Sequence, residues 1–294
     1  MPPLFDRHHI RHAFSRSAHS YDAAAALQHE VEKRLLESLD YLGGRTPQTV
    51  LDLGCGPAHA AAAMRKRWPH AQIIAADLAL PMLQQAKKQA GWWNPFARVN
   101  ADAAALPFAD ASLDVIFSNL CLQWVEDLPA ALAGFRRVLK PGGLLLCSTF
   151  GPHTLHELRE AFATADERPH VSPFASIAQF GDSLMRAGFR DPVLDRDNFD
   201  LTYPGLPALM RELRALGATN ALQTRRRTLT GRARFAAAAQ AYESLRNADG
   251  QLPGTWEVIY AHAWAPDAGA PIRHGNDEIA SIPLSAIPIR RKPA

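Results

Sequence analysis

A glycine-containing turn between an apolar stretch and an alanine-rich stretch constrains this chain more than any other feature. The apolar run 49–53 contains Asp52 and is followed by Gly54 and Gly56, one residue apart, before a helical pattern over 58–68. Since glycine has no Cβ, both positions let the backbone bend sharply and approach a ligand closely. The order predicts a strand, a tight turn and a helix whose first N–H groups face a ligand site.

Two further acidic residues follow apolar runs at the same interval. The run 71–76 ends in Asp77, 25 residues after Asp52, and the run 96–99 leads to Asp102, another 25 residues on. A carboxylate at a strand tip can accept hydrogen bonds from both hydroxyls of a ribose. An aspartate after a strand is also a common helix cap or turn residue. Three such residues at an even spacing favour one shared site.

The turn differs from the dinucleotide-binding fingerprint Gly-x-Gly-x-x-Gly, because His59 stands where the third glycine would be. A diphosphate on the helix N-terminus is therefore disfavoured as the ligand. The pattern Asp52-x-Gly54-x-Gly56 instead resembles the first motif of the class I S-adenosylmethionine-dependent methyltransferases. Ala58 replaces a glycine that is common at that place in those enzymes.

The resemblance implies that S-adenosylmethionine is the cofactor and methyl donor. It implies that Asp77 binds the ribose hydroxyls, that Asp102 binds the adenine amino group, and that Ala103 offers its backbone N–H to the ring. The predicted cofactor-binding residues are Asp52, Gly54, Cys55, Gly56, Asp77, Leu78, Asp102, Ala103 and Asn119.

Composition restricts the partners and the compartment. The 294 residues include 32 basic and 29 acidic ones, and the net charge of +3 is too small to indicate a nucleic-acid binder. The three cysteines are odd in number and form no zinc spacing with each other or with histidines, so we expect reduced thiols and no metal. The sequence shows neither a signal peptide nor a membrane-length apolar run. We expect a cytoplasmic monomer that binds no membrane.

Strands and helices alternate through the first half of the chain. After the third acid, the pattern predicts a strand over 113–119, a helix over 127–139 and a strand over 144–150. This alternation predicts an α/β fold with a doubly wound, mostly parallel sheet, which the resemblance implies to be seven-stranded. The alternating segment 256–264 predicts an antiparallel edge strand.

The remaining segments complete the predicted domain organisation. We expect helices over 23–42, 154–165, 175–187, 206–216 and 232–246, and a strand over 192–203. The prediction is an N-terminal helical lid (1–44), an S-adenosylmethionine-binding core (45–150), the rest of the sheet with a helical insertion for substrate or partner (151–265), and a disordered tail (266–294).

Outside the cofactor motifs, the chain resembles the malonyl-acyl-carrier-protein O-methyltransferases of biotin synthesis over most of its length. The most specific run is Phe-Gly-Pro-His-Thr-Leu-His-Glu-Leu at 150–158, in which His153 stands where an acid is common. Similar segments are 13–28, 216–220, 225–230 and 260–264. The resemblance implies methyl transfer to the free carboxylate of a malonyl thioester, on acyl-carrier protein or coenzyme A, which primes pimeloyl synthesis.

This chemistry needs few catalytic groups. A carboxylate with a pKa near 4 is already ionised at neutral pH, so no general base is required. Orientation and exclusion of water lower the barrier instead. An arginine, a tyrosine or another donor is expected to hold the carboxylate. The candidates are Arg16 and Tyr21 in the lid, and Gln123 and Trp124 after the fourth strand. The simpler alternatives are a solvated surface charge for Arg16 and core aromatic residues for Tyr21 and Trp124.

An acidic acyl-carrier protein is the expected partner, and a basic patch would attract it. The predicted partner-binding residues are Arg211, Arg214, Arg225, Arg226 and Arg227. A run of three arginines is also typical of a solvated loop.

Other functions stay open at this point. A nucleobase methyltransferase would need an Asn/Asp-Pro-Pro-aromatic signature after the fourth strand, where the sequence 118–121 reads Ser-Asn-Leu-Cys. A quinone-type small-molecule methyltransferase would share the cofactor half. A methyltransferase-fold assembly factor of respiratory complex I is the third alternative.

Overall fold

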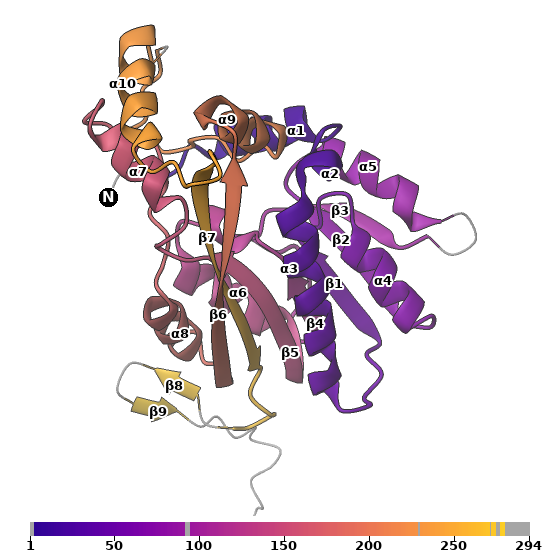
Figure 1. Ribbon diagram of the computed structural model, residues 1–294. Coiled ribbons are helices and arrows are strands. Elements are labelled where there is room, and N and C mark those ends of the chain that lie inside the picture. Colours follow the sequence, from indigo (N-terminus) through magenta and orange to yellow (C-terminus); the bar gives the residue numbers. More distant parts are fainter. Residues whose placement is uncertain (1–2, 92–94, 229, 271, 275–276, 280–294) are drawn as a thin grey trace, which may run out of the picture.

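The chain forms one seven-stranded sheet with helices on both faces (Figure 1). The computed structural model describes residues 3–91, 95–228, 230–270, 272–274 and 277–279. The strand order is β3-β2-β1-β4-β5-β7-β6, and β7 runs opposite to the other six strands of this sheet. The seven strands are β1 (Thr49–Leu53), β2 (Gln72–Asp77), β3 (Ala97–Asn100), β4 (Leu113–Ser118), β5 (Leu139–Phe150), β6 (Arg190–Tyr203) and β7 (Leu252–Trp264). The predicted fold class is confirmed.

The helices follow the predicted alternation, with shifted ends. Their bounds are α1 (Arg7–Ser17), α2 (Tyr21–Ala24), α3 (Ala26–Glu37), η1 (Ser38–Leu42), α4 (His59–Arg67), α5 (Leu80–Ala90), η2 (Leu122–Trp124), α6 (Leu128–Val138), α7 (His156–Ala163), α8 (Ile177–Arg186), α9 (Leu206–Ala215) and α10 (Arg232–Glu243). Among the described residues, none of the helices combines the length and the hydropathy of a membrane-spanning segment.

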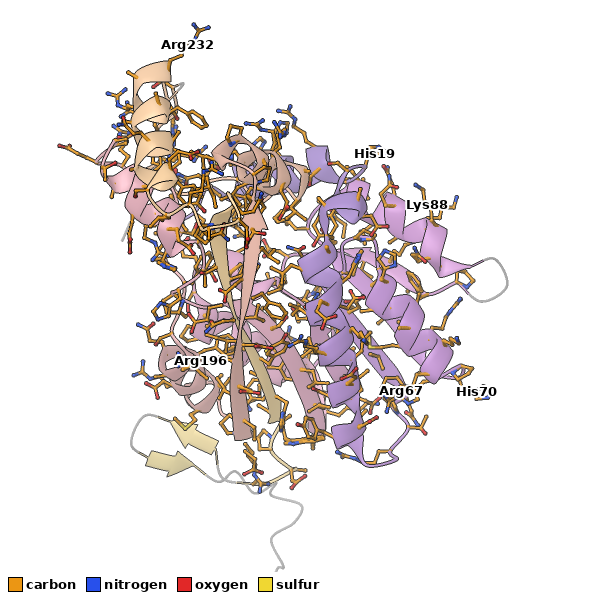
Figure 2. All side chains as sticks on the ribbon, viewed as in Figure 1. His19, Arg67, His70, Lys88, Arg196 and Arg232 are labelled. Atoms are coloured by element: carbon orange, nitrogen blue, oxygen red, sulfur yellow. The ribbon has the colours of Figure 1, made fainter. Side chains whose placement is uncertain are left out.

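The central strands are mostly apolar because helices cover both faces of the sheet. On one face, Val50 packs with Met64 of α4 and Leu35 of α3. On the other face, Leu51 packs with Phe135 of α6 and residues of α8. Side chains fill the space between the layers, while polar residues such as Arg67, His70 and Lys88 project from the rim (Figure 2). The sheet is therefore a rigid base for whatever its strand ends present.

The N-terminal lid is more segmented than predicted. The expected single helix over 23–42 is divided into α2, α3 and η1. The first break falls at the buried Ala25, which leaves helical geometry (φ −88°, ψ 31°) between α2 and α3. The preceding α1 was not predicted separately. It begins at Asp6, whose carboxylate accepts the His9 N–H (3.0 Å), as an N-cap does. Together α1 and α2 lie over one end of the sheet (Figure 1).

Two strands differ in place or length from the prediction. Strand β5 begins at Leu139 rather than 144, so the Pro-Gly-Gly segment lies within it. The antiparallel strand β7 lies between β5 and β6, next to the edge, and β6 forms the edge itself. The many charged residues of β6 suit this position, because charged side chains discourage further strand pairing at a sheet edge.

The segment predicted as a disordered tail contains a short hairpin. Strand β8 (Ile272–His274) pairs antiparallel with β9 (Asp277–Ile279), at the end of the sheet opposite the lid (Figure 1). The prediction for 280–294 lies outside the described residues.

Candidate active site

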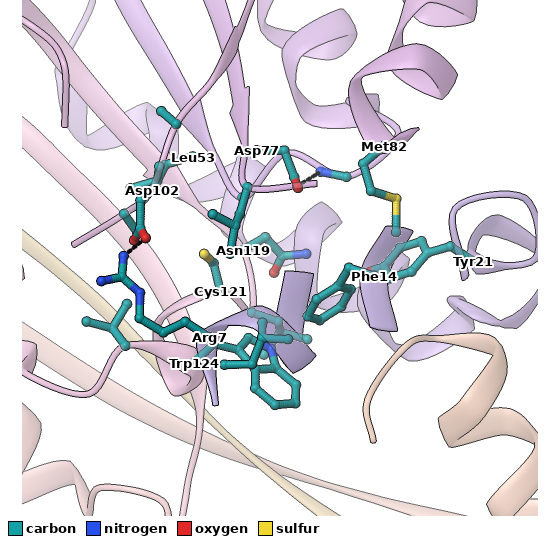
Figure 3. A pocket seen from close by; sticks show the side chains of 18 residues that line it. Arg7, Phe14, Tyr21, Leu53, Asp77, Met82, Asp102, Asn119, Cys121 and Trp124 are labelled. Carbon is teal, nitrogen blue, oxygen red and sulfur yellow. Dashed lines mark hydrogen bonds and ion pairs between the residues drawn. The ribbon is translucent and has the colours of Figure 1, made fainter. Parts of the chain in front are cut away.

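A cavity lies where β1, β2 and β4 end, beneath the lid (Figure 3). Its empty volume is about 780 Å³, including the space at its mouth. Ligands in open α/β sheets bind at this carboxyl edge of the parallel strands. Most predicted cofactor residues are among its lining residues, namely Gly54, Gly56, Asp77, Leu78, Asp102, Ala103 and Asn119.

The glycine turn closes tightly against the exit of β4. Gly54 has φ +70°, and a Cβ there would lie 2.5 Å from Sγ of Cys121, so the position admits no side chain. The N–H of Gly54 donates to the Ala76 carbonyl (2.8 Å), which ties the turn to β2. Ala58 also has a left-handed conformation (φ +67°), which strains a non-glycine residue. The turn thus has the shape that the sequence motif predicts.

Asp77 fastens the end of β2 to this turn. One carboxylate oxygen accepts the Gly56 N–H (3.0 Å) and the other accepts the Ala79 N–H (2.7 Å). Burial raises the pKa of Asp77 to about 6, although these two hydrogen bonds favour its ionised form. The carboxylate also faces the cavity (Figure 3). It therefore organises the turn and remains available to a ligand.

Asp102 is paired with a lid residue that sequence reasoning missed. The guanidinium of Arg7, from α1, forms an ion pair with the Asp102 carboxylate (Figure 3). The same carboxylate accepts the N–H of Ala104 (2.9 Å). Arg7 has no sequence signal, because only the docking of α1 brings it to the third strand's end.

Two predicted cofactor residues do not line the cavity. Asp52 is 2 % exposed, and its carboxylate accepts the N–H of Ala61 inside α4 (2.9 Å). Burial raises the pKa of Asp52 well above its usual value. Cys55 packs in the buried cluster beneath α4. For Asp52 the cause is strand geometry: successive side chains point to opposite faces, so Asp52 turns toward α4. Here Asp52 anchors the helix that follows the turn.

Asn119 links the exit of β4 to the lid. Its amide nitrogen donates to the backbone carbonyl of Gln28 in α3 (3.0 Å), and its oxygen accepts the Ser148 hydroxyl (2.7 Å). Ser148 in turn accepts the N–H of Leu120 (3.0 Å). This network fixes the amide of Asn119 at the cavity wall.

The four catalytic candidates separate into two pairs. Tyr21 and Trp124 line the cavity, and Trp124 packs edge-on against Phe14 with ring centroids 5.4 Å apart. Burial raises the pKa of Tyr21, so its hydroxyl stays a donor. Gln123 lies outside the cavity lining, and its amide donates to the Leu120 carbonyl (2.6 Å). Arg16 faces a second hollow, because it lies on the side of α1 away from the cavity.

The arginine run proposed for a partner is largely engaged within the chain. Arg225 pairs with Asp6 (2.8 Å), and Arg226 makes two contacts with Asp166 (2.9 and 3.1 Å). Arg227 donates to the side chain of Gln223 (3.1 Å). Arg225 and Arg226 therefore hold distant segments together, which corrects the expectation of one continuous patch. Of the five predicted partner-binding arginines, Arg211 and Arg214, on α9, border the second hollow.

We predict that Arg226→Gln lowers the free energy of unfolding more above pH 4 than below it. The Arg226 guanidinium lowers the pKa of Asp166, which is buried, so this pair stabilises the fold above the unfolded-state value near 4. That contribution is lost as the pH falls through the folded-state pKa. Urea unfolding at several pH values should show a wild-type advantage at pH 7 that shrinks below pH 4. An advantage independent of pH would contradict the ion-pair account.

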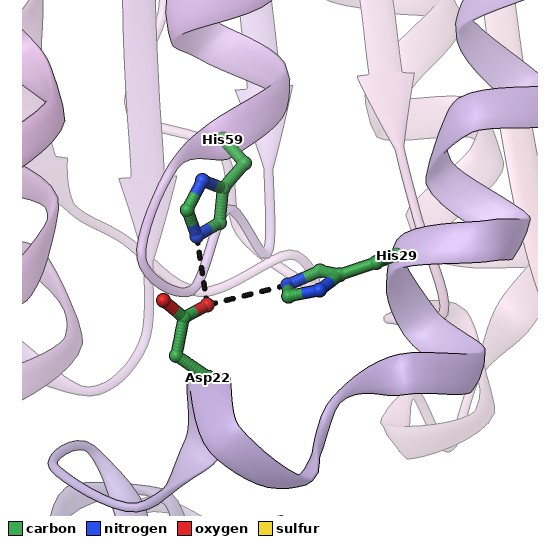
Figure 4. Close-up of side chains that lie close together, drawn as sticks. All are labelled: Asp22, His29 and His59. Atoms are coloured by element: carbon green, nitrogen blue, oxygen red, sulfur yellow. Dashed lines mark hydrogen bonds and ion pairs between the residues drawn. The ribbon is translucent and has the colours of Figure 1, made fainter.

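Another contact ties the lid to the core. Nε2 of His59, at the start of α4, lies 2.7 Å from Oδ1 of Asp22 in α2, and Nε2 of His29 in α3 lies 3.2 Å from the same oxygen (Figure 4). The three potential ligand atoms all lie within 4.8 Å of one another. The spacing of residues in the sequence does not reveal this cluster of Asp22, His29 and His59, because the three residues come from three different elements.

Comparisons with known proteins identify the class. The methyltransferase-domain family matches residues 51–147. The YcgJ protein of Bacillus subtilis has a TM-score of 0.57 at 19% identity, covering 80% of this chain and 99% of that chain. The phosphoethanolamine N-methyltransferase 2 of Haemonchus contortus has a TM-score of 0.56 at 18% identity, covering 86% and 57%. The strand-end cavity thus belongs to a methyltransferase fold.

Sequence relatives define the family further. The malonyl-[acyl-carrier protein] O-methyltransferase of Xylella fastidiosa is 66% identical, over 99% of both chains. The protein of the same name from Methylovorus is 45% identical, over 96% of this chain and 97% of its own. The chain belongs to the malonyl-[acyl-carrier protein] O-methyltransferase family and is an O-methyltransferase.

Proposed function

We propose that the enzyme transfers a methyl group from S-adenosylmethionine to the free carboxylate of malonyl-acyl-carrier protein. The product is the malonyl methyl ester that primes pimeloyl synthesis for biotin. The observation that carries this proposal is the 66% identity, over nearly the whole of both chains, to a malonyl-[acyl-carrier protein] O-methyltransferase. Since that match extends through the late helices, it includes the segments where substrate choice is expected to reside.

The residues at the cavity suit the methyl donor. Asp77 offers a buried carboxylate acceptor at the tip of β2, and Gly54 and Gly56 keep the turn clear of side chains. Asp102 and the backbone of Ala103 line the part beneath Arg7. We propose that these groups hold the ribose and adenine of the cofactor. S-adenosylmethionine, when bound, supplies an electrophilic methyl group on a sulfonium.

The chain's own residues then orient the acceptor and exclude water. Phe14, Tyr21 and Trp124 form an aromatic wall at the lid side of the cavity (Figure 3). A malonyl carboxylate is ionised at neutral pH, so no residue needs to remove a proton. We propose that the Tyr21 hydroxyl donates to one carboxylate oxygen and leaves the other directed at the methyl group. Such orientation in a dry site supplies several kcal/mol of the barrier reduction.

Setting and partners complete the proposal. We propose that the enzyme acts as a cytoplasmic monomer on carrier-bound malonate rather than on nucleic acid or a membrane component. The three cysteines are unpaired, which suits a reducing compartment. The small net charge of +3 favours a defined contact with an acidic carrier over a general affinity for polyanions.

A genetic test distinguishes this function from the two remaining alternatives. Deleting the gene should cause a requirement for biotin that the wild-type gene relieves. A respiratory defect without a biotin requirement would instead support the complex I assembly role. A quinone-type methyltransferase would leave biotin synthesis intact and change the quinone pool, which extraction and chromatography measure.

A further inference from the structure

A second hollow lies beside the cavity, between α1 and α9. Its empty volume is about 1120 Å³, including open space at its mouth. The side chains that give it its character are basic or hydroxylic, namely His9, His12, Arg16, Arg211, Arg214 and Thr219. No aspartate or glutamate is among the residues that line it. The hollow is therefore a concave surface whose charged side chains are all positive.

The three arginines of the hollow are not used by the fold. Within the described ranges, Arg16, Arg211 and Arg214 form no hydrogen bond or ion pair, in contrast with Arg225 and Arg226. Several guanidinium groups around one concave surface repel one another unless an anion lies between them. Their planar donor sets match phosphate oxygens particularly well. The arrangement therefore suits a phosphate ligand.

The walls of the hollow are held in place. The Ser20 hydroxyl donates to the Ala215 carbonyl (2.9 Å), which joins the end of the α1 region to α9. At Gly217, a Cβ would lie 2.6 Å from Oγ of Ser17, so the two segments touch with no space between them. The spacing of Arg16 from the arginines of α9 is thus set by packing and does not depend on a ligand.

Only the thickness of α1 separates this hollow from the cavity. Ile10 and Phe14 face the cavity, whereas Ala13 and Arg16 face the hollow. A helix with its side chains is about 10–12 Å across. A pantetheine chain is comparable to four extended residues, or about 14 Å. Ser20 lines the hollow and the next residue, Tyr21, lines the cavity, so such a chain can pass the C-terminal end of α1 instead of crossing the helix. A phosphate in the hollow could therefore be joined to a thioester in the cavity.

We propose that this hollow binds the phosphate of the phosphopantetheine arm that carries the malonyl thioester, with Arg16, Arg211 and Arg214 as its donors. The proposal rests on the malonyl-thioester substrate of the proposed function. The same phosphopantetheine chemistry occurs on carrier protein and in coenzyme A. The hollow binds the phosphate that carrier protein and coenzyme A have in common, and the carrier's own surface adds contacts elsewhere.

Calorimetry tests the hollow without requiring turnover. The probes are 4′-phosphopantetheine and pantetheine, and the variant is Arg211→Gln/Arg214→Gln. Its control, Arg227→Gln, removes an arginine outside the hollow. We expect phosphopantetheine to bind roughly tenfold or more weakly to the double variant, the loss typical of charged hydrogen bonds, and to bind the control unchanged. Equal affinity of the wild type for the two probes, or of the double variant and wild type for phosphopantetheine, would overturn the proposal.

Steady-state kinetics separate the hollow from the catalytic step. The double variant should have a higher KM than the wild type for malonyl-phosphopantetheine, malonyl-coenzyme A and malonyl-carrier protein, and its kcat should differ less than twofold. For malonyl-pantetheine, which has no phosphate, both KM and kcat should equal those of the wild type. A raised KM for the carrier substrate alone would show that the hollow binds the carrier's acidic surface, and would overturn the phosphate assignment. Failure of the wild type to methylate any of these substrates would refute the proposed function, while calorimetry would still decide the hollow.

Discussion

Replacing Asp77 with alanine is expected to weaken S-adenosylmethionine binding by roughly 1–3 kcal/mol, or about 5- to 150-fold. The carboxylate is the acceptor at the tip of β2, and it also holds the Gly56 and Ala79 N–H groups. Its loss should remove the proposed contact with the cofactor and loosen the turn. Calorimetry with the purified variant measures the affinity, and thermal unfolding shows whether the variant is folded. Unchanged affinity in a folded variant would contradict the assigned cofactor site.

The same residue predicts a pH dependence of cofactor binding. Burial raises the pKa of Asp77 to about 6, so the acceptor becomes protonated as the pH falls through 6. Affinity should be constant above pH 7 and should fall below pH 6, whereas the Asp77→Asn variant should lack this step. We expect the opposite trend for the stability of the ligand-free protein: because the folded-state pKa exceeds the unfolded value near 4, ionising Asp77 should reduce the free energy of unfolding as the pH rises from about 4 to 6.

Substituting alanine at Gly54 is expected to lower the free energy of unfolding by roughly 2–4 kcal/mol. Two causes add. The left-handed backbone (φ +70°) disfavours any Cβ, and that Cβ would lie 2.5 Å from Sγ of Cys121 and 2.6 Å from its Cβ. Urea unfolding measures the change. Cofactor affinity should fall as well, because the turn and the exit of β4 are forced apart at the cavity wall.

Gly44→Ala is the matched control for this substitution. Gly44 also has a positive φ (+85°), but no atom lies within 4 Å of its Cβ position. It should therefore show the backbone cost alone, about 1–2 kcal/mol. In the Gly54→Ala background, Cys121→Gly should recover the contact cost and leave the backbone cost. Equal losses at Gly44 and Gly54 would show that the contact with Cys121 is unimportant.

The core was predictable from sequence because its determinants are local. An apolar run, a glycine turn and an acid at a strand end are contiguous patterns, and parallel strands bring their carboxyl ends to one edge. Strands β1 to β4 accordingly differ from the predicted ranges by only a residue or two. The exception is Asp52, where strand alternation decides the direction of the side chain and points it to α4.

The positions of the lid and of the basic residues depend on contacts between segments that are distant in the sequence. Which face of α1 meets the cavity is set by its packing on α5 and α9, so no sequence pattern indicates Arg7, and Arg16 lies at the second hollow rather than at the cavity. The sequence suggested that the arginine run is solvated or binds a partner, because Asp6 and Asp166, with which Arg225 and Arg226 form ion pairs, lie far away in the chain. Periodicity identifies an amphipathic helix but does not say what the helix will cover.

The central claim is that this cavity brings a methyl donor to a malonyl carboxylate. The most direct test is incubation of the purified enzyme with labelled S-adenosylmethionine and malonyl-carrier protein, with acetyl-carrier protein as the control that lacks the free carboxylate. The expected result is labelled methyl ester on the malonyl carrier and none on the acetyl carrier. Label on neither carrier, or equal label on both, would contradict the account.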